Sequence, residues 1–140
     1  MDCLFCKIAK KEIPAEIIYE DDNTVAFLDI QPIAPGHAMV IPKDHAENVL
    51  DLPDEKVGPV FLTIKTITAI LNTALRPSGF TVGINHGKAA GQAIDHLHVH
   101  VIPRFAGDGG KSMHSIVKNP PQESIKEIAN KLKKINENRG

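Results

Sequence analysis

Residues 96–102 read His96-Leu97-His98-Val99-His100-Val101-Ile102, so histidine alternates with aliphatic residues. Alternation with a period of two is typical of a β-strand that buries one face. We therefore predict a strand over 97–103. Along extended backbone from His96, the three histidines share one face and the aliphatic side chains point to the core. Neighbouring imidazoles would then lie about 6.6 Å apart at their Cα atoms.

Four other segments have the composition of strands. Residues 16–19 and 24–28 are rich in β-branched and aromatic residues, and Asp21-Asp22-Asn23 between them favours a turn. Residues 37–42 and 80–85 have the same character. Because hairpins dominate and no β-α-β alternation occurs, the sequence predicts an α+β fold with an antiparallel sheet of about five strands.

Three segments have the character of helices. Apolar residues recur every three to four positions over 54–75, which predicts a long helix with one buried stripe. A short helix is expected over 4–11. A charged C-terminal helix is expected over 122–136, with Pro121 in its first turn.

The length and composition predict one domain over 1–140, with a core over 1–105 and a C-terminal loop and helix over 106–140. The formal net charge of the 140 residues is -1. Nucleic-acid-binding proteins usually carry a basic excess, so we expect no nucleic-acid partner. We recognise no signal peptide and no stretch apolar enough to span a bilayer, and therefore expect a cytoplasmic protein without a membrane partner.

Cys3 and Cys6 are the two cysteines of the chain. In a reducing compartment this Cys-x-x-Cys spacing is typical of a metal-ligand pair or a redox dithiol. The redox interpretation is less favoured, because no thioredoxin-like β-α-β pattern surrounds the pair. Two small buried thiols in a helix are the remaining alternative.

The histidine row itself has three interpretations. A solvated strand face would be served equally well by Thr, Lys or Glu. One metal ion could be chelated by two of the histidines, but the outer pair lies about 13 Å apart at Cα. The third interpretation is attack on phosphorus by a neutral imidazole, with neighbouring groups that hold phosphate oxygens and protonate the leaving group. The central His98 is then the candidate nucleophile.

The run also fits the histidine triad motif, His-φ-His-φ-His-φ-φ with φ apolar, and residues 1–105 resemble the histidine triad (HIT) superfamily. The other matching segments, in chain order, are Cys3-Leu4-Phe5-Cys6-Lys7-Ile8, Lys11-Glu12-Ile13-Pro14, Phe27-Leu28-Asp29-Ile30, Ala34-Pro35-Gly36-His37, Val40-Ile41-Pro42-Lys43 and Gly91-Gln92. The resemblance implies a HIT-like fold, a homodimer and an enzyme acting on nucleotides.

The resemblance also implies residue roles. His98 corresponds to the nucleophile that takes a nucleoside monophosphate, and His100 to the member that contacts the phosphate and assists the leaving group. His37 corresponds to a supporting histidine from the third strand. Asp29 corresponds to a carboxylate that binds ribose hydroxyls, although a turn carboxylate before Pro32 is an alternative.

The remaining substrate-binding residues rest on the same resemblance. Asn85 and Gln92 correspond to polar groups near the phosphate and the leaving group. The walls of a purine pocket correspond to apolar side chains, which core packing would explain equally well: Leu4, Phe5, Ile8, Phe27, Leu28 and Ile30.

Two branches of the family share features with this chain. Ala93 stands where the nucleoside phosphoramidate branch usually has a serine, whereas Ile102-Pro103-Arg104 and Gly107-Asp108 look like the branch that cleaves dinucleoside polyphosphates. The resemblance therefore implies hydrolysis of a phosphorus bond in either class of purine nucleotide, through a nucleotidyl-histidine. The alternative is a zinc-stabilised nucleotide sensor or interaction module with incidental hydrolysis.

Some members of the family bind zinc with a set that corresponds to Cys3, Cys6, His45 and His96. Four protein ligands close the coordination sphere, which is the pattern of a structural Zn²⁺ rather than a catalytic one. Such a site would take His96 out of the chemistry and leave His98 and His100.

Overall fold

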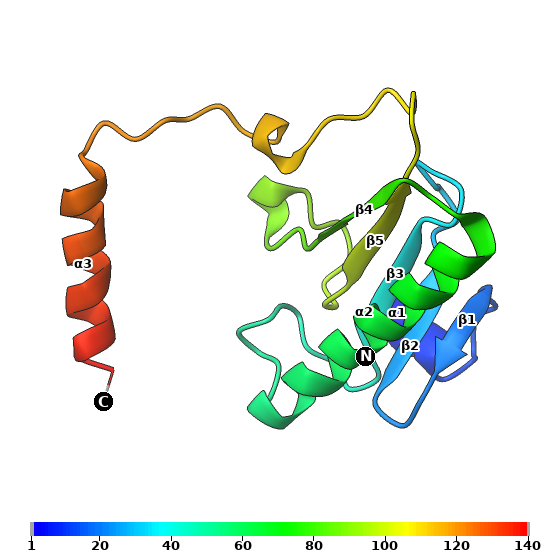
Figure 1. The fold of residues 1–140 in the computed structure, drawn as a ribbon. Helices are drawn as coiled ribbons and strands as arrows, with labels where there is room; N and C mark the ends of the chain where they lie inside the picture. Colours follow the sequence, from blue (N-terminus) through cyan, green and yellow to red (C-terminus); the bar gives the residue numbers. More distant parts are fainter. Residues whose placement is uncertain (1, 140) are drawn as a thin grey trace. The chain divides into compact units, whose positions relative to one another are not determined.

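A computed structural model describes residues 2–139 and divides the chain into two units (Figure 1). The first unit ends at Gly110 and the second begins at Lys111. The boundary therefore lies slightly beyond residue 105, where the sequence analysis ended the core. All the site residues expected from the sequence belong to the first unit.

The first unit is built on one antiparallel sheet of five strands in the order β1-β2-β3-β5-β4. This confirms the predicted α+β class. The strands are β1 (Ile17–Glu20), β2 (Thr24–Leu28), β3 (Ala38–Pro42), β4 (Gly79–Gly83) and β5 (Val99–Arg104). The helical elements are α1 (Leu4–Ala9), α2 (Asp54–Leu75) and the short 3₁₀ helix η1 (Lys88–Ala90).

The two faces of the sheet carry separate apolar clusters, because side chains alternate along each strand. On one face, Val99 and Val101 of β5 pack with Ile64 and Ile67 of α2. A second cluster joins α1 to strand residues of the opposite alternation: Cys3, Phe5, Ile8, Val25, Phe27, Met39 and Ile41. His100 lies between two residues of the first cluster, so its side chain faces the α1 side.

The predicted strand over 97–103 begins later than expected, and only His100 of the three histidines lies within β5. The β3–β5 register pairs Val40 with Val99 and, continued, would bring Ile41 opposite His98 and then Pro42 opposite Leu97. Pro42 has no N–H to donate, and the Leu97 N–H donates to the carbonyl of Ala46 at 2.7 Å instead. His96 and His98 therefore sit in the irregular segment that leads into β5.

Helix α2 matches its predicted bounds, but its composition corrects the expectation that no stretch of the chain is apolar enough to span a bilayer. An 18-residue window within its 22 residues has mean hydropathy 1.3, so by length and composition alone it could cross a membrane. Core helices pass the same test, and α2 places Val60, Ile64 and Leu71 against the sheet. Its other side exposes Phe61 and Leu62, at 56% and 67% of their surface.

The second unit contains the short 3₁₀ helix η2 (Met113–Ser115) and the helix α3 (Ile125–Glu137). Helix α3 begins later than the predicted residue 122, because Ser124 caps it. The Ser124 hydroxyl accepts from the Glu127 N–H and the Glu127 carboxylate accepts from the Ser124 N–H, both at 3.1 Å. This reciprocal capping box fixes the first turn and leaves Pro121 outside the helix.

Gly36, immediately before His37, generates a prediction about stability. Its φ is +80°, and a Cβ there would lie 2.4 Å from Leu75 Cδ1. Gly36→Ala should lower the free energy of unfolding by about 1–3 kcal/mol, because it adds backbone strain and crowding together. Chemical denaturation measures the change.

Gly58→Ala is the matched control, because a Cβ at this position of α2 meets nothing within 4 Å. It should raise stability by about 0.5–1 kcal/mol. Equal effects of the two substitutions would contradict the account of Gly36.

Candidate active site

Three histidines and one carboxylate meet on the α1 side of the sheet. His37 directly precedes β3, and its Nε2 lies 2.9 Å from Nδ1 of His100 on β5. The ring of His98 stands 5.1 Å from that of His100 between centroids. Asp29 follows β2 and places Oδ2 3.6 Å from His37 Nε2. The structure thus brings together the four residues for which the sequence predicted a role in catalysis or ribose binding.

Hydrogen bonds determine which nitrogen of His37 and His100 carries the proton. The Ile33 N–H donates to Nδ1 of His37 at 3.2 Å, so a neutral His37 carries its hydrogen on Nε2. That N–H donates to Nδ1 of His100. A neutral His100 therefore carries its own hydrogen on Nε2 and presents a donor at the far side of its ring.

The tautomer of His98 is fixed in the opposite sense. Its Nδ1 lies 2.7 Å from the backbone oxygen of His96, and a carbonyl can only accept. Nδ1 therefore carries the hydrogen, and Nε2 carries a free lone pair. The side chain is only 7% exposed, yet within residues 2–139 every fully buried side-chain nitrogen or oxygen has a hydrogen-bond partner. Because Nε2 of His98 has none, it reaches the surface.

Burial keeps two of these rings neutral. Desolvation, followed by the nearby His98 and His37, lowers the pKa of His100 to about 4, against a smaller opposing effect of Asp29. Desolvation also lowers the pKa of His37, again opposed by Asp29. Neutral imidazoles are what the hydrogen-bond chain requires, because a protonated His37 could not accept from Ile33.

Asp29 forms a hydrogen bond within a turn and also faces the histidines of the site. Its Oδ1 accepts from the Gln31 N–H at 2.9 Å, which is the turn role that the sequence left open. Its Oδ2 faces His37. A pocket of about 460 Å³ opens beside it, lined by Leu28, Asp29, residues 32–35, Gly36 and His37.

The other apolar residues expected in a purine pocket lie in different places. Phe5, Ile8 and Phe27 are buried in the cluster between α1 and the sheet. Leu4 lines a second pocket of about 370 Å³, next to Cys3 and His45. Ile30 is 90% exposed. Only Leu28 and Asp29 of the predicted substrate-binding set line the pocket beside His37.

The side chain of Gln92 forms hydrogen bonds with backbone groups around the loop before the triad, and it does not project out of that loop. Its amide donates to the carbonyls of Glu47 and Ile94 at 2.8 and 3.0 Å, and its oxygen accepts from the Gly87 N–H at 2.8 Å. Asn85 is exposed. Local sequence does not reveal the partner Glu47, because it lies 45 positions from Gln92.

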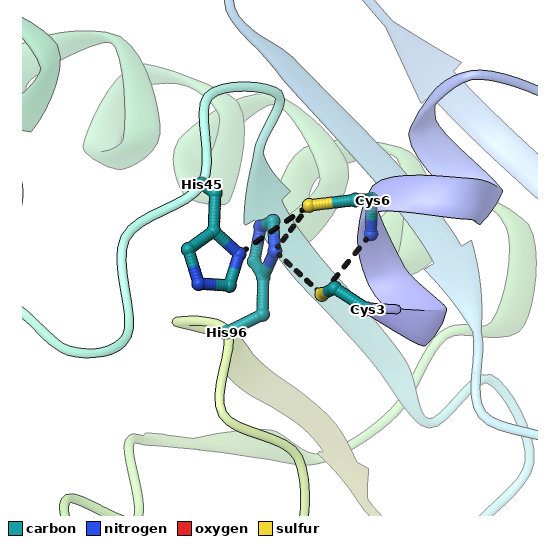
Figure 2. Close-up of side chains that lie close together, drawn as sticks. All are labelled: Cys3, Cys6, His45 and His96. Atoms are coloured by element: carbon teal, nitrogen blue, oxygen red, sulfur yellow. Dashed lines mark hydrogen bonds between the residues drawn. The ribbon is translucent and has the colours of Figure 1, made fainter. Parts of the chain in front are cut away.

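A second cluster, the Cys/His cluster, consists of Cys3, Cys6, His45 and His96 (Figure 2). Cys3 is the N-cap of α1 and Cys6 lies one turn on, so both sulfurs point toward His96 from the same helix end. Nδ1 of His96 lies 3.4 and 3.5 Å from the two sulfurs, and Nδ1 of His45 lies 3.3 Å from Cys6 Sγ.

These distances fit a tetrahedral zinc site. Bond lengths of about 2.3 Å to sulfur and 2.0–2.1 Å to nitrogen give ligand-to-ligand edges of about 3.5 Å. The tautomer fits too, because Nε2 of His96 donates to the Pro42 carbonyl at 2.9 Å and leaves Nδ1 free to bind metal. The residues predicted as metal ligands are therefore assembled with suitable donor atoms.

Asp29, His37 and His100 also bring three potential ligand atoms together. A metal on Nε2 of a neutral His37 would move its hydrogen to Nδ1, toward the Ile33 N–H that now donates there. That conflict makes this trio a poor metal site and favours its use as a hydrogen-bond relay.

Comparison with known proteins shows to which family the chain belongs. The HIT domain model matches residues 10–107. The chain belongs to the HIT family. This confirms the resemblance inferred from the histidine run and its flanking segments.

Related HIT sequences come from distant organisms. The chain is 42% identical over 133 residues to adenosine 5'-monophosphoramidase HNT1 of Saccharomyces cerevisiae, covering 94% of this chain and 78% of the relative. It is 41% identical to an uncharacterized HIT-like protein of Methanocaldococcus jannaschii, covering 90% and 98%.

Solved HIT structures share the fold. A HIT family protein from Bacillus subtilis has a TM-score of 0.87 at 32% identity and covers 100% of this chain and 99% of its own. A Zn-bound histidine triad family protein from Mycobacterium smegmatis has a TM-score of 0.73 at 33% identity, with coverage of 98% and 97%.

The lowered pKa of His100 predicts how stability depends on pH. Between its ordinary value of 6.5 and about 4, the unfolded residue binds a proton that the folded one does not. Stability should therefore fall as the pH drops through this window, by at most about 3 kcal/mol from His100. Urea unfolding at several pH values measures the slope.

His100→Gln should flatten that slope, whereas replacement of the exposed His114 by Gln should leave it unchanged. An unaltered slope in the His100 variant would show that burial does not keep this ring neutral.

Proposed function

We propose that the protein is a nucleotide hydrolase that transfers a nucleoside monophosphate to Nε2 of His98 and then to water. The observation that carries the proposal is the opposite protonation of adjacent rings. His98 presents a lone pair, while His100 presents an N–H. A nucleophile next to a hydrogen-bond donor that can hold a phosphate oxygen is an arrangement suited to phosphoryl and nucleotidyl transfer.

The first step forms a bond between His98 Nε2 and phosphorus and breaks the bond from phosphorus to the leaving nitrogen or oxygen. The Nε2–H of His100 donates a hydrogen bond to a phosphate oxygen and stabilises the negative charge there, and the leaving group takes its proton from solvent water. His37 orients His100 through its Nε2–H. In the second step water attacks phosphorus and releases a proton to solvent, and the bond from phosphorus to His98 Nε2 breaks, which restores the lone pair of His98.

The nucleoside would enter the pocket beside Asp29. The Oδ2 atom of Asp29 is free of the turn hydrogen bond and can accept from ribose hydroxyls.

The fungal relatives named adenosine 5'-monophosphoramidase support an adenosine phosphoramidate substrate. A purified sample assayed with an adenosine phosphoramidate and with diadenosine tetraphosphate decides between the two leaving groups. Uniformly slow turnover would favour a nucleotide sensor instead.

The Cys/His cluster would hold a structural Zn²⁺. Its four donors leave no open position for substrate, and the Zn-bound relative from Mycobacterium smegmatis supports a metal in this family. When bound, the ion would tie α1 to the segment before β5. The proposed reaction uses His98, His100 and His37, which are not part of this cluster.

We also propose a cytoplasmic homodimer. Helix α2 leaves Phe61, Leu62 and Ile70 exposed at 56%, 67% and 42% of their surface. Exposed apolar side chains on one helix make α2 a candidate contact between proteins. A second copy is the occupant that the family resemblance implies, and sedimentation analysis of Leu62→Lys tests it.

His98→Ala should abolish turnover, with a loss of about 10³-fold or more, while binding of AMP stays nearly unchanged because the pocket beside Asp29 remains. Steady-state kinetics and calorimetry measure the two effects. His114→Ala, a change of an exposed histidine in the second unit, is the control and should retain full activity. Residual turnover in the His98 variant near the wild-type rate would refute the proposed function.

Cys6→Ser should lower the zinc content of the purified protein, because it removes one of four donors. A loss of about 3 kcal/mol of stabilisation would lower Tm by roughly 10 °C in a domain of this size. Elemental analysis and calorimetry measure both. His86→Ala, outside the cluster and exposed, should change neither. Wild-type protein without bound metal after zinc supplementation would argue for two buried thiols instead.

A further inference from the structure

The second pocket, of about 370 Å³, opens beside the Cys/His cluster and has no part in the proposed reaction. Two of the four potential metal ligands line it, Cys3 and His45, together with the acidic residues Asp2, Glu47 and Asp95. Among the described residues that line the pocket, none is a lysine or an arginine. The pocket therefore combines negative charge with direct access to a set of metal ligands.

The four ligands differ in how far solvent reaches them. His96 is 0% exposed and Cys3 is 8% exposed, whereas Cys6 is partly buried and His45 is exposed. The two buried ligands are also held in place, because Cys3 caps α1 and Nε2 of His96 donates to the Pro42 carbonyl. His45 lies on a loop between β3 and α2 (Figure 2). An ion that reaches the buried donors from this pocket therefore passes His45.

We propose that this pocket is the entry route for the metal ion of the Cys/His cluster, and that Glu47 and Asp95 draw the hydrated cation into it. The inference rests on the proposal that the cluster binds Zn²⁺. Within residues 2–139 neither carboxylate forms a salt bridge, so both charges are available to an incoming cation. Asp2 differs, because Lys7 Nζ lies 2.7 Å from its Oδ1.

The charge around the ion changes along this route. A hydrated Zn²⁺ ion in the pocket carries two positive charges. In the finished site each cysteine has released its proton to solvent, and two thiolates with two neutral imidazoles cancel the charge of the ion. Carboxylates in the pocket thus attract the entering ion more strongly than the bound one. They should speed uptake and release together and leave the equilibrium affinity nearly unchanged.

Glu47→Gln combined with Asp95→Asn tests the proposal in the full-length protein. Stopped-flow mixing of the reduced, metal-free protein with Co²⁺ measures uptake through the absorbance of the cobalt–thiolate bonds. Release into excess EDTA, at concentrations where the rate no longer depends on EDTA, measures the reverse step. Focused charge changes association rates by about 10- to 10³-fold, so we expect removal of two charges to slow both steps by about 3- to 10-fold. Titration with Co²⁺ should give an unchanged Kd.

Glu16→Gln combined with Asp22→Asn is the matched control. Both residues are exposed, neither lines the pocket, and the two substitutions change the net charge of the chain by the same amount. Uptake and release should both keep their wild-type rates. An equal slowing in the two double variants would show that the overall charge of the protein matters rather than the pocket, and would overturn the proposal.

Other results would also overturn it. Unchanged rates in the Glu47 and Asp95 variant would show that the ion takes another path. Slower uptake with faster release and a weaker Kd would show that the carboxylates stabilise the bound ion instead of the entering one. Wild-type protein that takes up no Co²⁺ at equilibrium would refute the metal site itself. Turnover enters none of these measurements, so failure of the proposed hydrolysis is distinguished from failure of the entry route.

Discussion

The backbone carbonyl of His96, which accepts a hydrogen from Nδ1 of His98 at 2.7 Å, decides the chemistry that the rest of the site can perform. It leaves the lone pair of His98 on Nε2, the atom that reaches the surface. The Ile33 N–H sets the opposite tautomer in His37 and His100. Two backbone groups therefore leave adjacent, similar rings presenting a free lone pair on His98 and a hydrogen-bond donor on His100.

The positions of these histidines depend on where strand β5 begins. Pro42 cannot continue the β3–β5 ladder, so the chain before β5 leaves the sheet and its polar groups find other partners. His96 then turns toward the cysteines of α1 and His98 toward the surface. The same interruption thus brings His96 to the Cys/His cluster and His98 to the group formed by His37, His100 and Asp29.

Much of the fold and of the site could be predicted from the sequence, because its signals are local. The period of two over 96–102, the stripe over 54–75 and the Cys-x-x-Cys spacing each reflect neighbours along the chain. The start of β5 and the full set of partners of Gln92 could not be predicted, since each involves a backbone group far away in sequence, the Ala46 carbonyl for β5 and the Glu47 carbonyl for Gln92. The contact of the Phe5 ring with His98 could not be predicted either, because it depends on how α1 packs on the sheet.

The central claim is that hydrogen bonds hold adjacent histidines in opposite tautomers. Long-range ¹H–¹⁵N correlation spectra of the imidazole rings at neutral pH test it most directly. The structure predicts that His98 is protonated on Nδ1, while His37 and His100 are protonated on Nε2. A His98 ring that carries its hydrogen on Nε2 would contradict the account.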